Sequence, residues 1–167
     1  MEKRRGKDMD IQILDDKVPN LYPILTALRS LPYYYGERDN SITPPTGMVF
    51  TFAETDTLYT DIINLCHTHF SQLEGLNPYR VYVNYFSATE NSYYHVDNSV
   101  GYTVLIYVNE EVNVDEGGET QFYNEVDHSI YGVLPKPGRM VCFDASILHK
   151  ATPFKSQSRF TIAAKFM

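Results

Sequence analysis

The second half of the chain is a succession of short runs rich in Val, Ile, Tyr and Phe that are separated by turn residues. Such runs are typical of strands, because β-branched and aromatic side chains pack well on a pleated surface. Eight of them follow Tyr79 and no helical periodicity interrupts them, which predicts a β-sandwich or barrel rather than a parallel α/β sheet. The predicted strands are residues 80–86, 93–97, 102–109, 119–123, 130–134, 139–143, 148–151 and 159–166.

The first half of the chain predicts a short edge strand, two helices and a long loop. The strand covers residues 10–14. Residues 21–30 carry Leu and Ile at helical spacing, and residues 55–70 do the same after a Thr-Asp-Thr cluster suited to an N-cap. The loop, residues 31–47, is rich in Pro, Tyr, Gly and Asn. It is either a plain surface connection or a segment that lines or covers a site. We expect the helices to buttress one face of a single domain.

Two histidines and an aspartate form a candidate metal site. His95 and Asp97 are two residues apart, so on a strand they lie on one face and can reach the same ion. His149 ends a strand-like run that begins at Met140 and could fold back beside them, which makes it the best candidate for a third ligand. Two histidines and one carboxylate on one side of an ion are the ligand set associated with non-haem Fe(II).

A second pair stands ten residues beyond His149. Arg159 and Thr161 also share one face of a predicted strand. A guanidinium is always charged and binds a carboxylate through two parallel hydrogen bonds, to which a neighbouring hydroxyl can add a third. An anionic cosubstrate could therefore be held here by one end while its other end chelates the metal.

Over about Val81 to Phe166 the sequence resembles the Fe(II)- and 2-oxoglutarate-dependent dioxygenases, and within them the prolyl 4-hydroxylase-like branch. The order and spacing of several motifs carry the resemblance: Tyr85 ten residues before His95, His95-Val-Asp97-Asn98, Thr103-Val-Leu-Ile-Tyr107-Val-Asn109, Gly117-Gly-Glu-Thr120, Phe143-Asp-Ala-Ser-Ile-Leu-His149 and Arg159-x-Thr161. The resemblance implies a double-stranded β-helix, a jelly-roll, cupin-like barrel of about residues 79–167 with the metal at its open mouth. It also implies a domain of residues 10–167 that includes the two helices.

The same resemblance assigns residues. His95, Asp97 and His149 would bind iron, and Arg159 would bind the distal carboxylate of 2-oxoglutarate. The rest of the cosubstrate pocket would be formed by Thr161, Tyr85, Tyr107 and Thr103. The implied reaction uses O2 and converts 2-oxoglutarate to succinate and CO2 while a C–H bond is hydroxylated. It requires no catalytic residue beyond the metal ligands, because the cofactor carries the chemistry.

The substrate positions depart from the pattern of the prolyl hydroxylases. Those enzymes often carry a Tyr three residues before the first ligand and a Trp six residues after the basic residue. Here Ser92 and Lys165 hold these places, Tyr93 lies beside the first, and the chain has no Trp. Ser92, Tyr93 and Lys165 are therefore candidates for contact with the substrate. Lys165 either faces an acidic substrate group or lies at a solvated strand end.

These features predict hydroxylation of an aliphatic C–H on a prolyl or other peptidyl, protein or amino-acid substrate. The alternatives are hydroxylation of a small metabolite and a non-enzymatic, metal-binding barrel of the cupin type. The net charge of −7 argues against a large nucleic-acid surface.

The remaining expectations concern the compartment of the protein. No apolar run is long enough to span a membrane, and the basic residues 1–9 are expected to form a flexible leader. The two cysteines, Cys66 and Cys142, are expected to be reduced core residues, which suits the cytoplasm.

Overall fold

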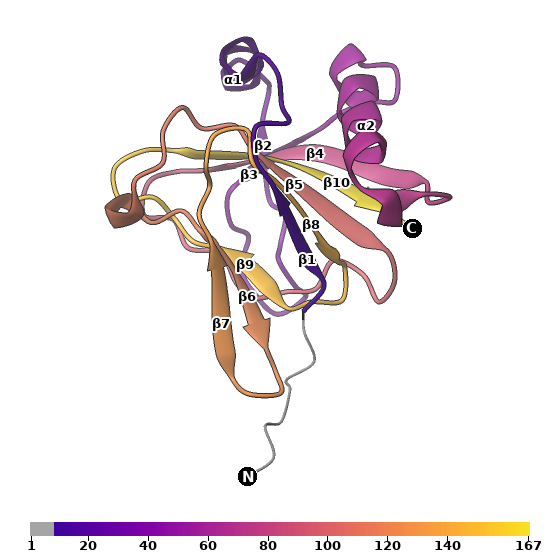
Figure 1. Cartoon of the computed structure of the whole chain (residues 1–167). Coiled ribbons are helices and arrows are strands. Elements are labelled where there is room, and N and C mark those ends of the chain that lie inside the picture. Colours follow the sequence, from indigo (N-terminus) through magenta and orange to yellow (C-terminus); the bar gives the residue numbers. More distant parts are fainter. Residues whose placement is uncertain (1–8) are drawn as a thin grey trace.

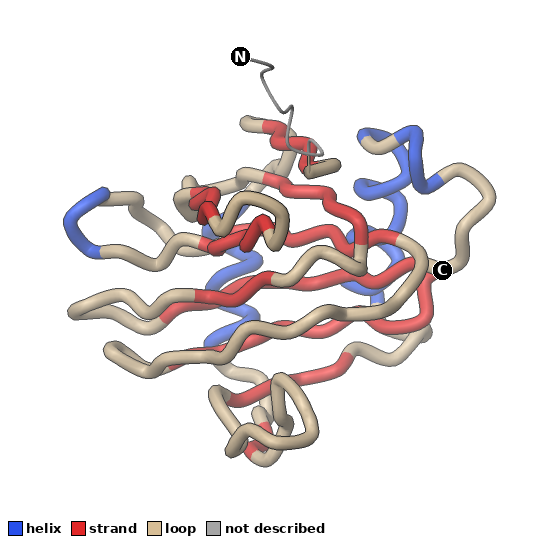
Figure 2. Tube along the Cα trace, turned by 90° about the horizontal axis from the view of Figure 1, so that it is seen from below, coloured by secondary structure: helices blue, strands red, loops and turns tan. Residues whose placement is uncertain are grey.

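Two β-sheets that face each other form the protein, and two helices cover the outer side of the larger sheet (Figure 1). The computed structural model describes residues 9–167, so the leader predicted at residues 1–9 lies, except for Met9, outside the described residues. The larger sheet has seven strands in the order β1-β8-β5-β10-β4-β3-β2, and the smaller has three in the order β7-β6-β9. All strand pairs are antiparallel, and Figure 2 shows the long strands of the larger sheet side by side.

The helices are α1 (Leu21–Arg29) and α2 (Thr57–His69), and the short 3-10 helices are η1 (Ser71–Leu73) and η2 (Val114–Glu116). The strands are β1 (Ile11–Leu14), β2 (Tyr34–Tyr35), β3 (Met48–Thr51), β4 (Pro78–Phe86), β5 (Tyr102–Tyr107), β6 (Thr120–Asn124), β7 (Ser129–Val133), β8 (Met140–Asp144), β9 (His149–Ala151) and β10 (Arg159–Phe166).

The predicted class, mainly β with two N-terminal helices, is confirmed, and seven of the eight strands predicted after Tyr79 form. The eighth, residues 93–97, pairs at a single point, the bridge between His95 and His149. The loop at residues 31–47 contains the two-residue strand β2, which pairs with β3, a strand that the sequence reading did not predict. β3 in turn pairs with β4.

Strand β10 places alternate side chains on the two faces of the larger sheet. Its even-numbered side chains pack toward the helices in a core with Leu25, Leu28, Ile62 and Cys66. Its odd-numbered side chains face the space between the sheets, because successive residues of a strand point to opposite faces. Each aliphatic side chain that is fully buried under the helices contributes about 1.5–3 kcal/mol to folding. The helices thus stabilise one face of the larger sheet and leave the other free to form a site.

The described residues also bear on the cysteines and on membrane insertion. Cys66 and Cys142 lie free in the core, as predicted. Burial raises the pKa of both thiols, that of Cys142 to about 12, so both stay protonated at neutral pH. Among the described residues, no helix has the length and apolar character needed to span a bilayer.

Candidate functional site

His95, Asp97 and His149 converge between the two sheets. The chain leaves β8 through a turn and enters β9 at His149, whose backbone exchanges two hydrogen bonds of 3.0 Å with that of His95. One ligand atom from each of the three side chains lies within 4.8 Å of the others. The Asp97 carboxylate reaches both rings, with one oxygen 3.6 Å from His95 Nε2 and the other 3.6 Å from His149 Nε2.

The two imidazoles are oriented by the backbone. His95 Nδ1 lies 3.0 Å from the Tyr93 carbonyl, and His149 Nδ1 lies 2.9 Å from the Ile147 carbonyl. A carbonyl only accepts hydrogen bonds, so in the neutral form of each ring Nδ1 carries the proton and Nε2 keeps a free lone pair. Burial lowers the pKa of His149 to about 4, which keeps this ring neutral at pH 7. Both lone pairs therefore point toward the centre of the cluster, as metal ligands require.

The Asp97 carboxylate is buried and charged. Its side chain is 2% exposed, Thr103 Oγ1 donates to Oδ2 at 2.6 Å, and Lys165 Nζ lies 2.7 Å from Oδ1. Burial alone would raise the pKa of Asp97, but in the acid range where this carboxyl titrates the Coulomb attraction of His149, Lys165 and His95 outweighs burial and lowers the pKa to about 2. The three side chains thus offer two imidazole nitrogens and one anionic oxygen, a donor set that fits Fe(II) and leaves coordination positions free.

Arg159 supplies a cation deeper between the sheets. The residue is 2% exposed, and its guanidinium donates from Nε to the Gly118 carbonyl and from Nη2 to Thr120 Oγ1, both at 3.0 Å. Tyr107 stacks beneath it at 5.6 Å and donates its own hydroxyl proton to Thr120 Oγ1 at 2.6 Å. These contacts use two of the five N–H donors of the guanidinium, so donors are left for a carboxylate.

Thr161 lies on the same face of β10, two residues from Arg159. Among the buried side-chain oxygen and nitrogen atoms of the described residues, its Oγ1 is the one without a hydrogen-bond partner. A buried hydroxyl without a partner is costly, and this one lines the cavity, so a group bound there can supply the partner. A carboxylate held by the free donors of Arg159 would do so.

One cavity of about 230 Å³ joins the metal end to the Arg159 end. Its lining includes the three metal-site residues together with Arg159, Thr161, Thr120, Lys165 and Ser92. Apolar side chains, among them those of Val49 and Leu105, complete the wall.

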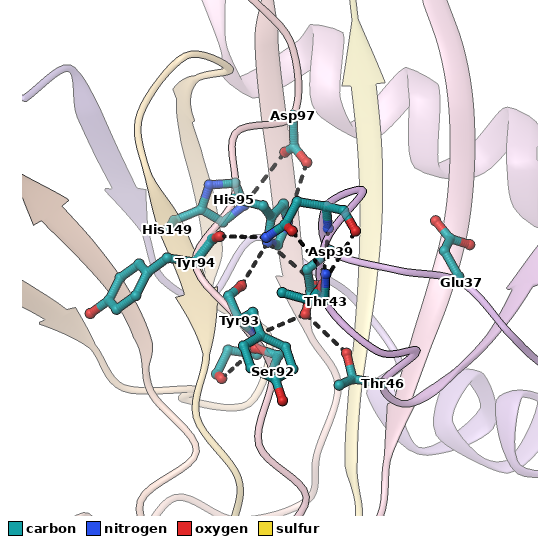
Figure 3. A network of polar contacts seen from close by, with 12 residues as sticks. Glu37, Asp39, Thr43, Thr46, Ser92, Tyr93, Tyr94, His95, Asp97 and His149 are labelled. Carbon is teal, nitrogen blue, oxygen red and sulfur yellow. Dashed lines mark hydrogen bonds and ion pairs between the residues drawn. The ribbon is translucent and has the colours of Figure 1, made fainter.

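The loop at residues 31–47 lines this cavity, which decides between the two readings of the sequence. Asp39 lies with one carboxylate oxygen 3.4 Å from His95 Nδ1, and with the other it accepts from Tyr93 N at 2.7 Å and from Thr46 Oγ1 at 2.9 Å (Figure 3). Glu37 and Arg38 also face the cavity. The loop is therefore part of the site rather than a plain surface connection.

Four of the predicted residues do not line the cavity. Tyr85 points to the helix side of β4, where it packs against Tyr33 and Phe160, because the side chains of β4 that face inward are those of its even-numbered residues. Tyr107 is fully buried behind Arg159, and Thr103 reaches the site only through Asp97. Tyr93 is 41% exposed and touches the site through its backbone.

The remaining two candidates for substrate contact do line the cavity. Ser92 is 5% exposed, but its hydroxyl is already bonded to the Ala151 carbonyl at 2.7 Å. Lys165 is not a solvated strand end, since its side chain is 12% exposed and paired with Asp97.

Several residues that line the site were not predicted. Asn84 lies in the cavity wall because it pairs in register with Thr161, and Tyr82 lies two residues before it on the same face. Thr120 belongs to the Gly-Gly-Glu-Thr motif, so its position in a motif was the available signal. Asp39 carried no such signal, because nothing in the local sequence links it to His95.

Comparisons with known proteins agree with this geometry. A family model described as "2OG-Fe(II) oxygenase superfamily" matches residues 78–167. A prolyl-4-hydroxylase from Pseudomonas putida has a similar structure with a TM-score of 0.71 and 14% identity, over 95% of this chain and 92% of that one. A prolyl hydroxylase from Trichoplax adhaerens, solved in complex with a hypoxia-inducible factor peptide fragment, gives a TM-score of 0.73 and 17% identity over 94% and 83%.

HygX from Streptomyces hygroscopicus, solved with nickel, 2-oxoglutarate and hygromycin B bound, is similar with a TM-score of 0.71 and 9% identity, over 95% of this chain and 82% of that one. At these identities the structural likeness concerns the fold. A search of curated protein sequences found no match.

The fold and the His-Asp-His cluster define a double-stranded β-helix protein with a candidate non-haem iron site. The match of the family model over more than half of the chain identifies it further. The chain belongs to the 2OG-Fe(II) oxygenase superfamily. Membership implies Fe(II), 2-oxoglutarate and O2 as its cofactor and cosubstrates and supports an oxidoreductase activity.

Proposed function

We propose that the protein hydroxylates an aliphatic C–H bond of a prolyl or other peptidyl or amino-acid substrate and forms succinate and CO2 from 2-oxoglutarate. One observation carries the proposal. The three metal-binding side chains and the Arg159–Thr161 pair line the same cavity, so a 2-oxo dicarboxylate can reach both ends at once. The unpaired Thr161 hydroxyl supports the assignment of the distal end.

The side chains of the site have separate roles in this proposal. Fe(II), with 2-oxoglutarate and O2, supplies the oxidising chemistry, and the chain binds and orients the reactants. His95, Asp97 and His149 would hold the metal, while Arg159 and Thr161 would bind the distal carboxylate. The Thr103 hydroxyl holds one oxygen of Asp97 and so fixes the plane of the carboxylate.

The choice of a peptidyl substrate has weaker support than the cofactor assignment. Two of the similar structures are prolyl hydroxylases, and one of them was solved with a peptide. Near the site, Tyr93 and Val96 are 41% and 50% exposed and provide apolar surface for a peptide. Hydroxylation of a small metabolite is the second candidate, because the loop that carries Asp39 covers one side of a cavity of only about 230 Å³.

The test is the formation of succinate from 2-oxoglutarate under Fe(II) and O2. We expect slow succinate formation without substrate and faster formation with a substrate, found by screening proline-containing peptides and free amino acids for a mass gain of about 16 Da, one oxygen atom. The Arg159→Met variant should lose this activity while it still binds the metal. If wild-type protein with bound Fe(II) forms no succinate with any compound, a non-enzymatic barrel of the cupin type becomes the better reading.

A further inference from the structure

Lys165 places a cation at the metal end of the cavity. It lies on the inward face of β10 opposite Thr103 of β5, and its side chain is 12% exposed. Its ammonium lies 2.7 Å from Asp97 Oδ1 and 5.2 Å from the centre of the Tyr82 ring. A lysine at this position is therefore part of the site and not of the solvated surface.

The ammonium has a donor to spare. An ammonium carries three N–H donors, and within the described residues Lys165 uses one on Asp97 and one on the Tyr82 side chain. The other acids that face the cavity are engaged elsewhere. Glu37 binds Arg80 at 2.6 Å, and Asp39 is held by the Tyr93 backbone and the Thr46 hydroxyl.

Metal binding would increase the electrostatic stabilisation that an anion beside Lys165 provides. Asp97 is the carboxylate that would bind the metal, and its negative charge would then be shared with a divalent cation. Lys165 would stand beside that cation in a largely buried place, where like charges repel strongly unless an anion separates them. A carboxylate next to the metal would relieve this repulsion.

We propose that Lys165 binds a carboxylate at the metal end of the cavity, so that the cavity has one cationic side chain at each end. The inference rests on the proposed function. Arg159 and Lys165 are six residues apart on one strand face, which separates their backbones by about 20 Å. They therefore do not serve the same carboxylate. The carboxylate at Lys165 comes either from the end of 2-oxoglutarate that chelates the metal or from the substrate that is oxidised.

The first arm of the test measures binding to the full-length protein saturated with Ni(II), which keeps the site loaded without turnover. Isothermal titration compares 2-oxoglutarate with 4-oxopentanoate, which has a methyl group in place of the carboxylate next to the keto group. We expect Lys165→Met to weaken 2-oxoglutarate binding about tenfold or more, since hydrogen bonds to charged groups are strong, and to leave 4-oxopentanoate unchanged. Lys165→Arg should retain most of the affinity, and Lys155→Met, at an exposed lysine, is the matched control.

The second arm tests the other source of the carboxylate. Pairs of proline-containing peptides with Asp or Asn beside the proline are compared for their stimulation of succinate formation. If 2-oxoglutarate affinity is unchanged in Lys165→Met but a preference of wild type for the Asp peptides disappears, the substrate supplies the carboxylate and the proposal stands.

Two results would overturn the proposal. One is that Lys165→Met changes neither the affinity for 2-oxoglutarate nor any peptide preference. The other is that it weakens 2-oxoglutarate and 4-oxopentanoate equally, which indicates that Lys165 only neutralises Asp97. If wild type forms no succinate at all, the proposed function fails, but the comparison of the two ligands still tests Lys165.

Discussion

Replacing Thr161 by Val should raise the stability of the metal-free protein and weaken the binding of 2-oxoglutarate. The Thr161 hydroxyl is buried and has no hydrogen-bond partner among residues 9–167, and such a group costs about 1–3 kcal/mol. Val has nearly the same shape, so the metal-free variant should be at least as stable as wild type. We expect a gain of about 1 kcal/mol, which for a chain of this size raises Tm by about 2–4 °C. In the same variant, 2-oxoglutarate should bind about 10-fold to 100-fold more weakly, because a hydrogen bond to a carboxylate is lost.

Thermal unfolding of the metal-free protein and titration of 2-oxoglutarate into the Ni(II) form measure the two effects. Thr120→Val is the matched control for stability, since Thr120 is equally buried but accepts hydrogen bonds from Tyr107 and Arg159. It should lose at least about 2 kcal/mol, because two buried donors lose their partner. The reasoning fails if Thr161→Val is less stable than wild type by more than about 1 kcal/mol and binds 2-oxoglutarate as well as wild type does.

Three further predictions concern the metal, pH and a tight turn. His95→Ala should lose bound metal, measured as metal content after dialysis; unchanged content and turnover would exclude His95 as a ligand. The hydrogen bonds from Arg139 lower the pKa of Asp15 to about 2, below its unfolded value of about 3.9. The stability that Asp15 contributes should thus be present above pH 4 and lost as the pH falls through about 2. Urea unfolding should therefore show that Asp15→Asn is less stable than wild type above pH 4 and that this difference in the free energy of unfolding vanishes as the pH falls to about 2. Gly118→Ala should destabilise the fold by about 2 kcal/mol or more, because φ is +81° and the added methyl overlaps a buried phenylalanine ring, whereas Gly75→Ala, with φ +78° and open space, should cost only about 1–2 kcal/mol by chemical denaturation.

Much of the candidate site could be predicted from local spacing. Arg159 and Thr161 are two residues apart on β10 and share a face for that reason. His95 and Asp97 have the same spacing, and the bridge between His95 and His149 holds them beside β9. The strand content follows in the same way from the Val, Ile, Tyr and Phe runs. These features belong to short segments, and each segment carries them before it meets the rest of the chain.

The structure differs from the sequence-based predictions at features that depend on pairing between distant strands. Tyr85 and Asn84 are neighbours, and only the register with β10, in which Asn84 lies opposite Thr161, decides that Asn84 faces the cavity. Residues 93–97 look like a strand, but their partner β9 is short and they pair at one bridge. A shift of one residue in the pairing register would move the side chains of a strand to the opposite face of the sheet, and local composition does not set that register.

The sequence alone determined the strand-rich class, the two helices, and the residues that can act as metal ligands and as a carboxylate-binding pair. Only the tertiary structure decided that the loop bearing Asp39 lines the cavity, that Lys165 pairs with Asp97, and that Thr161 is buried with no partner in the described part of the chain. The physical reason is the range of the interactions. Periodicity acts over a few residues, whereas these contacts arise when β10, β5 and residues more than fifty positions apart are brought together between the two sheets.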